Sequence, residues 1–238
     1  MKFVLGSIAS VALVAGAAQA TTFSFASDND HTSYTWRGNG ALIRNAQDPA
    51  DPMLLVIDDE NGPAPSLTYA VDFRATFQLT PSAPLDLGGG RVLHSYGIVG
   101  VPESGSFGFY LPSGAPLLLA TFTGGNMSSL GTASAWGTSG GVQATDIAGQ
   151  VTYTWFGPDM PEYGLFNGAS SMGLDDAAFT LTSLNSNGNP GVTLGDSNLP
   201  NAEWFAEGSY SGTARFVPAP GALGLLGLGT LVVSRRKR

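Results

Sequence analysis

The sequence predicts an all-β fold, an antiparallel β-sandwich or jelly roll, flanked by an N-terminal signal helix and a C-terminal short transmembrane helix. Three observations lead to this prediction. Apolar and polar residues alternate over residues 67–80, short β-rich segments are separated by clusters of turn residues, and no apolar pattern of period 3.6 persists within 21–216.

The clearest strand signal is LTYAVDFRATFQLT, residues 67–80, in which every odd position is apolar and every even position except Ala70 is polar. A period of two places one face of a strand on a core and the other in water, as is typical of antiparallel sheets. At about 3.3 Å per residue the stretch would span ~46 Å, which is long for one strand. We therefore expect a bend or bulge near its middle.

The remaining predicted strands are short and rich in β-branched or aromatic residues. They are residues 21–27, 53–58, 106–111, 116–123, 151–156, 178–184 and 210–217. The turn clusters between them are rich in Gly, Pro, Asn and Ser, and they cover residues 59–66, 81–90, 123–129, 137–141, 157–164 and 185–191. This spacing predicts one β domain over residues 21–216.

The composition excludes several kinds of chemistry. The chain has no cysteine, which removes disulfides, cysteine-ligated zinc, iron–sulfur clusters and cysteine nucleophiles. Residues 21–216 contain 18 acidic residues, five arginines and no lysine, a formal charge of −13. Such a surface repels phosphate backbones, so we expect no nucleic-acid partner.

The N-terminus has the order of a secretory signal peptide, predicted here as residues 1–20. Lys2 supplies a positive charge, residues 3–18 are almost entirely apolar or small, and Ala18-Gln19-Ala20 forms a small-residue cleavage site before Thr21. The predicted partners are the export machinery and signal peptidase, and the mature chain would begin at Thr21. The alternative is a buried N-terminal helix.

One motif resembles a hydrolase nucleophile. GTSGG at 137–141 fits G-x-S-x-G around Ser139, but that motif needs a strand before the serine, a helix after it and a later histidine. Both histidines, His31 and His94, come earlier in the chain. We therefore predict a glycine-rich loop at 137–141, no catalytic residues, and a structural role for His94 in its strand.

Three acidic segments have the oxygen-rich character of calcium loops. They contain Asp28 and Asp30; Asp58, Asp59, Glu60 and Asn61; and Asp175 and Asp176. None matches the EF-hand spacing, so no metal ligand is assigned and no cofactor is predicted. We expect a solvated acidic surface, and calcium bound at one such loop is the alternative. Two carboxylates could also cleave a glycosidic bond, but among 18 acids a pair always exists.

Two aromatic pairs, Trp155-Phe156 and Trp204-Phe205, lie in predicted strands. Adjacent strand residues point to opposite faces, so one member of each pair should face away from the main core. That member is either covered by a loop or exposed as a platform on which a sugar could stack.

The C-terminal segment, VPAPGALGLLGLGTLVVSRRKR at 217–238, combines an apolar run with a basic end. The thirteen residues of 221–233 would form a helix of about 20 Å, against about 30 Å of bilayer hydrocarbon. Pro218 and Pro220 prevent its extension backward, and the basic cluster that follows would stay in the cytoplasm; it consists of Arg235, Arg236, Lys237 and Arg238. The segment is either recognised and cut, or kept as a single-pass anchor.

This segment resembles the PEP-CTERM sorting signal of bacteria. Pro218-Ala219-Pro220 stands where that family has Pro-Glu-Pro, and the match covers about 22 of the 238 residues. The resemblance implies recognition by exosortase, an integral-membrane cysteine protease of species that make extracellular polysaccharide. It implies nothing about residues 21–216, because the signal is carried by cargo of many unrelated kinds.

Together these features predict a non-enzymatic exported protein of the cell surface or extracellular matrix. It would be held transiently in the membrane by its tail and then lie on the cell surface or outside the cell. The first alternative is a carbohydrate-binding module for exopolysaccharide, with or without calcium, and the second is a secreted hydrolase. A flat exposed patch of tryptophans would favour the module, whereas a cleft with two carboxylates of shifted pKa would favour the hydrolase.

Overall fold

The computed structural model describes residues 20–26, 34–37, 41–45, 53–59, 62–99, 105–144, 151–171 and 175–216. Within these residues the all-β prediction is confirmed, since every pairing between strands is antiparallel. The helical structure in the same residues is one 3-10 turn, η1 (Pro161–Tyr163). No helix in this part of the chain is long and apolar enough to cross a membrane.

The strands are numbered in the order in which they follow one another along the chain. They are β1 (Ala20–Ala26), β2 (Tyr34–Arg37), β3 (Ala41–Asn45), β4 (Met53–Asp59), β5 (Leu67–Thr76), β6 (Gln78–Pro81), β7 (Leu85–Gly88), β8 (Arg91–Val99), β9 (Gly105–Tyr110), β10 (Pro116–Phe122), β11 (Asn126–Thr132), β12 (Ala135–Ala144), β13 (Val151–Trp155), β14 (Asp176–Ser186), β15 (Asn189–Pro190), β16 (Val192–Thr193) and β17 (Glu203–Arg215).

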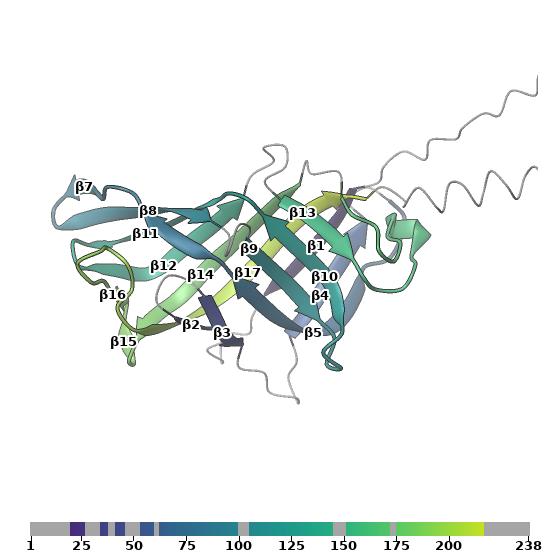
Figure 1. The fold of residues 1–238 in the computed structure, drawn as a ribbon, viewed down its shortest axis with the longest axis horizontal. Helices are drawn as coiled ribbons and strands as arrows, with labels where there is room; N and C mark the ends of the chain where they lie inside the picture. Colours follow the sequence, from purple (N-terminus) through teal and green to yellow (C-terminus); the bar gives the residue numbers. More distant parts are fainter. Residues whose placement is uncertain are drawn as a thin grey trace, which may run out of the picture.

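The sheet curls on itself as a half-barrel, and β5 makes the turn from one layer to the other (Figure 1). Residues 67–71 of β5 pair with β4, whereas residues 72–76 pair with β9. One layer runs β4–β1–β17–β14–β12–β11–β8, and the other runs β5–β9–β10–β13. The predicted bend in the 67–80 segment is therefore observed, and the segment is also interrupted at Phe77 between β5 and β6.

Aromatic side chains fill the space between the two layers. Phe73 of β5 lies 4.9 Å from Phe179 of β14, and Phe107 of β9 lies 5.3 Å from Tyr210 of β17, measured between ring centroids. The predicted alternation holds, since the odd residues from Val71 to Leu79 are buried. The apolar face of β5 thus packs directly on the facing layer.

The first and last strands of the domain lie side by side (Figure 1). Ala20 pairs with Arg215, and the pairing of β1 with β17 continues to Ala26 opposite Ser209. Farther along the same strand β2 pairs with β17, where Trp36 stacks on Trp204 with ring centroids 5.1 Å apart. Both ends of the β domain therefore leave from one end of the molecule.

Four predicted turn regions are wrong at least in part, because strands form within them. Residues 137–141 lie inside β12, and β7 lies inside the predicted turn 81–90. At Gly131 and Gly137 an added Cβ would come within 2.0 and 2.4 Å of backbone oxygens of the neighbouring strand, so only glycine permits this close pairing. Similarly, β11 begins at Asn126 inside the predicted turn 123–129, and β15 lies inside the predicted turn 185–191.

We call the projecting part of the sheet the wing, defined as residues 85–99 and 126–144 of β7, β8, β11 and β12. It extends beyond the curled part of the sheet, at the left of Figure 1, away from the ends of β1 and β17. The hairpin between β7 and β8 turns through Gly88, Gly89 and Gly90, with φ of 80°, 62° and 76°. This left-handed backbone is accessible to glycine without strain.

Candidate functional site

A buried polar cluster ties β13 to β14 and β17. The hydroxyl oxygens of Tyr153 and Tyr210 are 2.5 Å apart, and the Tyr153 hydroxyl lies 2.7 Å from the backbone oxygen of Asp176, to which it can donate. Both tyrosine side chains point inward because they occupy buried alternate positions of their strands. The cluster fixes the edge strand of one layer to the middle of the other.

The two aspartates beside this cluster hold backbone and side-chain hydrogens. The buried Asp175 carboxylate accepts hydrogen bonds from the Ser171 hydroxyl and, at 3.3 Å, from the backbone N–H of Arg215. Asp176 accepts the backbone N–H of Thr213 through Oδ1 at 2.7 Å. The Ser171 hydroxyl oxygen in turn accepts the backbone N–H of Tyr153 at 2.8 Å. These contacts give the predicted acidic pair a structural role.

Burial sets the protonation state of both tyrosines. It raises the pKa of Tyr153 far above its usual value, an effect opposed by the hydrogen bond from Tyr210 and reinforced by Asp176 and Asp175. The pKa of Tyr210 is also raised well above its usual value, first by burial and then by Tyr153. Both hydroxyls therefore stay protonated at neutral pH.

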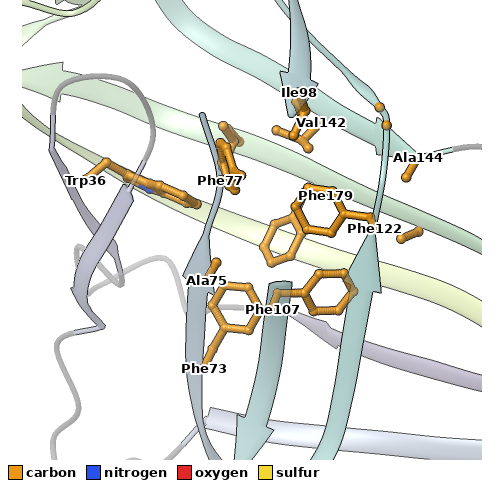
Figure 2. Close-up of a pocket in the computed structure, with 14 residues that line it drawn as sticks. Trp36, Phe73, Ala75, Phe77, Ile98, Phe107, Phe122, Val142, Ala144 and Phe179 are labelled. Atoms are coloured by element: carbon orange, nitrogen blue, oxygen red, sulfur yellow. The ribbon is translucent and has the colours of Figure 1, made fainter. Parts of the chain in front are cut away.

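An apolar cavity lies between the layers near the base of the wing (Figure 2). Its volume, counted as the space that the centre of a water molecule could occupy, is about 30 Å³. Its wall includes Trp36, Phe73, Phe77, Phe107, Phe122 and Phe179. A space of this size with an apolar wall is expected to stay dry and to be too small for a sugar or an acyl chain. It brings no polar groups together for chemistry.

The G-x-S-x-G segment at 137–141 does not form a nucleophile elbow. Ser139 lies within β12, where its backbone oxygen accepts the Ser129 hydroxyl at 2.8 Å, and the strand continues past it to Ala144. The Nε2–H of the buried His94 donates to the backbone oxygen of Thr132 at 2.6 Å, which agrees with the predicted structural role. His31 lies outside the described residues.

The acidic segment at 58–61 is described only in part. The Asp58 carboxylate accepts the Ser66 hydroxyl at 3.2 Å, while Asp59 is buried and its Oδ2 has no hydrogen-bond partner among the residues that the structure describes. Across the described ranges, no three histidine, aspartate or glutamate side chains gather as a metal site would require. The other residues of the three acidic segments, Asp28, Asp30, Glu60 and Asn61, fall outside the described part of the chain.

The tryptophans belong to the core. Trp36, Trp136, Trp155 and Trp204 are all buried. The outward member of each aromatic pair is a phenylalanine, as Phe156 is 39% exposed and Phe205 is half-buried. The prediction that one member faces away from the core is confirmed, but the described residues present no tryptophan platform.

The predicted processing sites lie at the two ends of the domain. Ala20 and Thr21 are the first two residues of β1, and the buried Thr21 hydroxyl donates to the backbone oxygen of Tyr163 at 2.6 Å. Ala18, the Pro218-Ala219-Pro220 motif and the basic cluster from Arg235 to Arg238 lie outside the described residues.

Comparison with known proteins adds no relative, since no family model, no curated protein and no solved structure matches the chain.

The tyrosine cluster was not predicted, although the sequence carries a signal for it. Tyr153 is the middle inward residue of VTYTW, and Gly212 follows Tyr210 by two positions, so the two face the same side of β17. A Cβ at Gly212 would lie 2.3 Å from both tyrosine hydroxyls. The sequence signal is therefore Tyr210 with a glycine two positions later on the same face, because the missing side chain at Gly212 leaves room for the Tyr153 hydroxyl.

Proposed function

We propose that this protein is a non-enzymatic exported protein of the cell surface or extracellular matrix, delivered by its C-terminal sorting tail. The observation that carries the proposal is the tail itself, an apolar run of thirteen residues after Pro218-Ala219-Pro220 and before four basic residues. Such an arrangement halts in a membrane with its charged end on the inner face.

The position of the strand ends supports this arrangement. The described residues begin at Ala20, in the predicted signal-peptidase site, and end at Phe216, next to the tail in sequence. Because Ala20 pairs with Arg215, both membrane-directed segments would leave from one end of the domain. The precursor could therefore have both segments in one membrane without distorting the sheet.

The identity of the cutting enzyme belongs to the same proposal. An exosortase-like membrane protease would recognise the segment from Pro218 onward and release the domain or transfer it to the surface. The exopolysaccharide of the cell is the proposed environment of the released domain. We do not extend this to sugar stacking on tryptophan, because all four indoles are buried.

We propose that the half-barrel is a β-sandwich of the jelly-roll type in which β5 joins the two layers. The ring contacts between β5 and β14 and between β9 and β17 support two facing layers.

The tail is tested by removing its charge. Replacing Arg235, Arg236, Lys237 and Arg238 with Ser and Asn should leave export intact but abolish membrane retention and C-terminal processing, because the apolar run is too short to hold alone. The matched control replaces the three arginines with lysine and keeps the charge. Immunoblots of membrane and soluble fractions compare both variants with the natural chain. Unchanged retention and unchanged processing in the neutral variant would contradict the sorting proposal.

A further inference from the structure

Four leucines form an exposed ridge across the outer face of the wing. Leu85 of β7 lies directly opposite Leu93 of β8, and Leu93 lies directly opposite Leu130 of β11. Leu87 follows Leu85 by two positions along β7. Leu85, Leu87 and Leu130 are 57%, 51% and 36% exposed, respectively, and Leu93 is half-buried. We call these four residues the leucine ridge.

The opposite face of the wing is covered. Val92, His94 and Tyr96 are buried on that side, and the Tyr96 hydroxyl lies 2.7 Å from the backbone oxygen of Asn198. Trp136 donates its indole N–H to the Tyr96 hydroxyl at 2.7 Å. The segment after β16 thus covers the inner face of the wing, whereas the leucine ridge lies on the solvent-exposed face. Contiguous apolar patches of a few hundred Å² often mark an interaction surface.

Charge indicates which partner fits the ridge. The wing contains one acid, Asp86, and one base, Arg91, whereas the remainder of residues 21–216 contains 17 acids and four arginines. Two copies of the protein repel each other wherever their acidic bodies meet, and the wing is the neutral part that projects away from that body (Figure 1). We propose that the leucine ridge binds the leucine ridge of a second copy across a two-fold axis.

A lipid surface fits the ridge less well. Asp86 lies between Leu85 and Leu87 near the hairpin tip, where its Oδ1 accepts the backbone N–H of Gly88 at 2.8 Å. Insertion of the tip would carry this carboxylate toward hydrocarbon, and the acidic body would be repelled by anionic headgroups. A second copy covers the leucines while Asp86, which projects from the other face of β7, stays in water.

The size of the ridge predicts a weak dimer. A few hundred Å² from each copy is less than the ~800 Å² per partner of a standard stable interface. The contact therefore forms at high local concentration, as when many copies share one surface. The dimer proposal does not depend on how the protein reaches that surface.

Single-cysteine crosslinking tests the proposal, because the chain has no cysteine of its own. Leu93 is the middle of the ridge, so Leu93→Cys should form a disulfide between copies when the full-length protein in mild detergent is oxidised. The matched control is Leu54→Cys on β4, since Leu54 is 48% exposed and more accessible to random collision than the half-buried Leu93. Non-reducing gels measure the dimer fraction, and thermal melts confirm that both variants fold.

The expected result is a disulfide dimer with Leu93→Cys and little with Leu54→Cys. Adding Leu85→Ser and Leu87→Ser to Leu93→Cys should lower the crosslinking rate about tenfold, because two of the four apolar contacts are lost. Equal crosslinking at both positions, or none at Leu93→Cys in a folded protein, would overturn the proposal. Binding to phosphatidylcholine vesicles that needs Leu85 and Leu87, without crosslinking, would overturn it in favour of a lipid partner.

Discussion

Tyr153, Tyr210 and Gly212 show how single residues hold the two layers of the half-barrel together. The two hydroxyls share a hydrogen bond in a site without access to water, and Gly212 leaves the space that they occupy. A buried hydroxyl pair of this kind stabilises the fold only while both groups are satisfied. The cluster therefore specifies how β13 lies against β17, and it should be sensitive to both volume and proton loss.

Adding a methyl group at Gly212 tests the volume requirement. In Gly212→Ala the new Cβ would lie 2.3 Å from both tyrosine hydroxyls, so the pair must separate. We expect a loss of about 2–3 kcal/mol in the free energy of unfolding. Gly97→Ala is the control, because its nearest heavy atom would be 4.0 Å away, and it should cost less than about 0.5 kcal/mol. Urea denaturation measures both, and equal losses would refute this role of Gly212.

Alkaline pH tests the protonation state. The pKa values of Tyr153 and Tyr210 are raised in the folded protein, whereas tyrosine in the unfolded chain titrates near 10. The stability contributed by these tyrosines is fully present below pH ~10 and is lost as the pH rises above it, by about 1.4 kcal/mol per pH unit for each residue. Tyr153→Phe should reduce this slope by about that amount between pH ~10 and ~11.5 in denaturant titrations. An unchanged slope would contradict burial of a protonated Tyr153.

At the scale of the element, β5 connects the two layers of the fold. Its first half pairs with β4 and its second half with β9, while its inward face contacts the facing layer through Phe73. The outer face of its second half carries Asp72 and Arg74, with the Arg74 guanidinium 4.2 Å from the ring centroid of Tyr110. The two faces of one strand therefore differ sharply in their contribution to stability.

Truncating the inner face of β5 should be far more costly than truncating its outer face. Phe73 is buried among Phe25, Phe107, Phe109 and Phe179, so Phe73→Ala should lower the free energy of unfolding by about 3–5 kcal/mol. Thr76 is exposed, and Thr76→Ala should cost only about a few tenths of a kcal/mol. Thermal unfolding of the two variants distinguishes the faces. Similar melting temperatures would show that the period of two does not report burial here.

Sequence patterns predicted β5 well because burial on one face leaves a period of two in the residues themselves. They did not predict its change of partner, since alternation reports which face is buried and not which strand lies beside it. They missed β12, because Gly137, Gly140 and Gly141 resemble a loop in composition. Close backbone approach at Gly137 is a tertiary requirement, and a short window of sequence carries little information about it.

The candidate sites also divide into features that local sequence predicts and features that depend on tertiary contacts. The buried position of His94 in its strand followed from local pattern, whereas the strand at Ser139 did not. The hydroxyl contact between Tyr153 and Tyr210 joins positions 57 residues apart, so it depends on the curl of the sheet. The register of Leu85, Leu93 and Leu130 likewise needs three strands to be aligned before the ridge exists.

At the scale of the whole molecule, the domain has two unlike ends. The ends of β1 and β17 lie together at one of them, next to the predicted signal segments, and the neutral wing projects at the other (Figure 1). In the proposed arrangement the wing points away from the membrane that holds the tail. Copies held side by side would then present their leucine ridges at the same height above that membrane.

The most direct test of the central claim is mass spectrometry of both ends of the protein isolated from its native cells. The account predicts a chain that begins at Thr21 and has lost the apolar run and basic cluster that follow Pro220. Cutting at Thr21 shows export, and loss of the tail shows that it is a processed sorting signal. A cytoplasmic chain that keeps both Met1 and Arg238 would contradict the account.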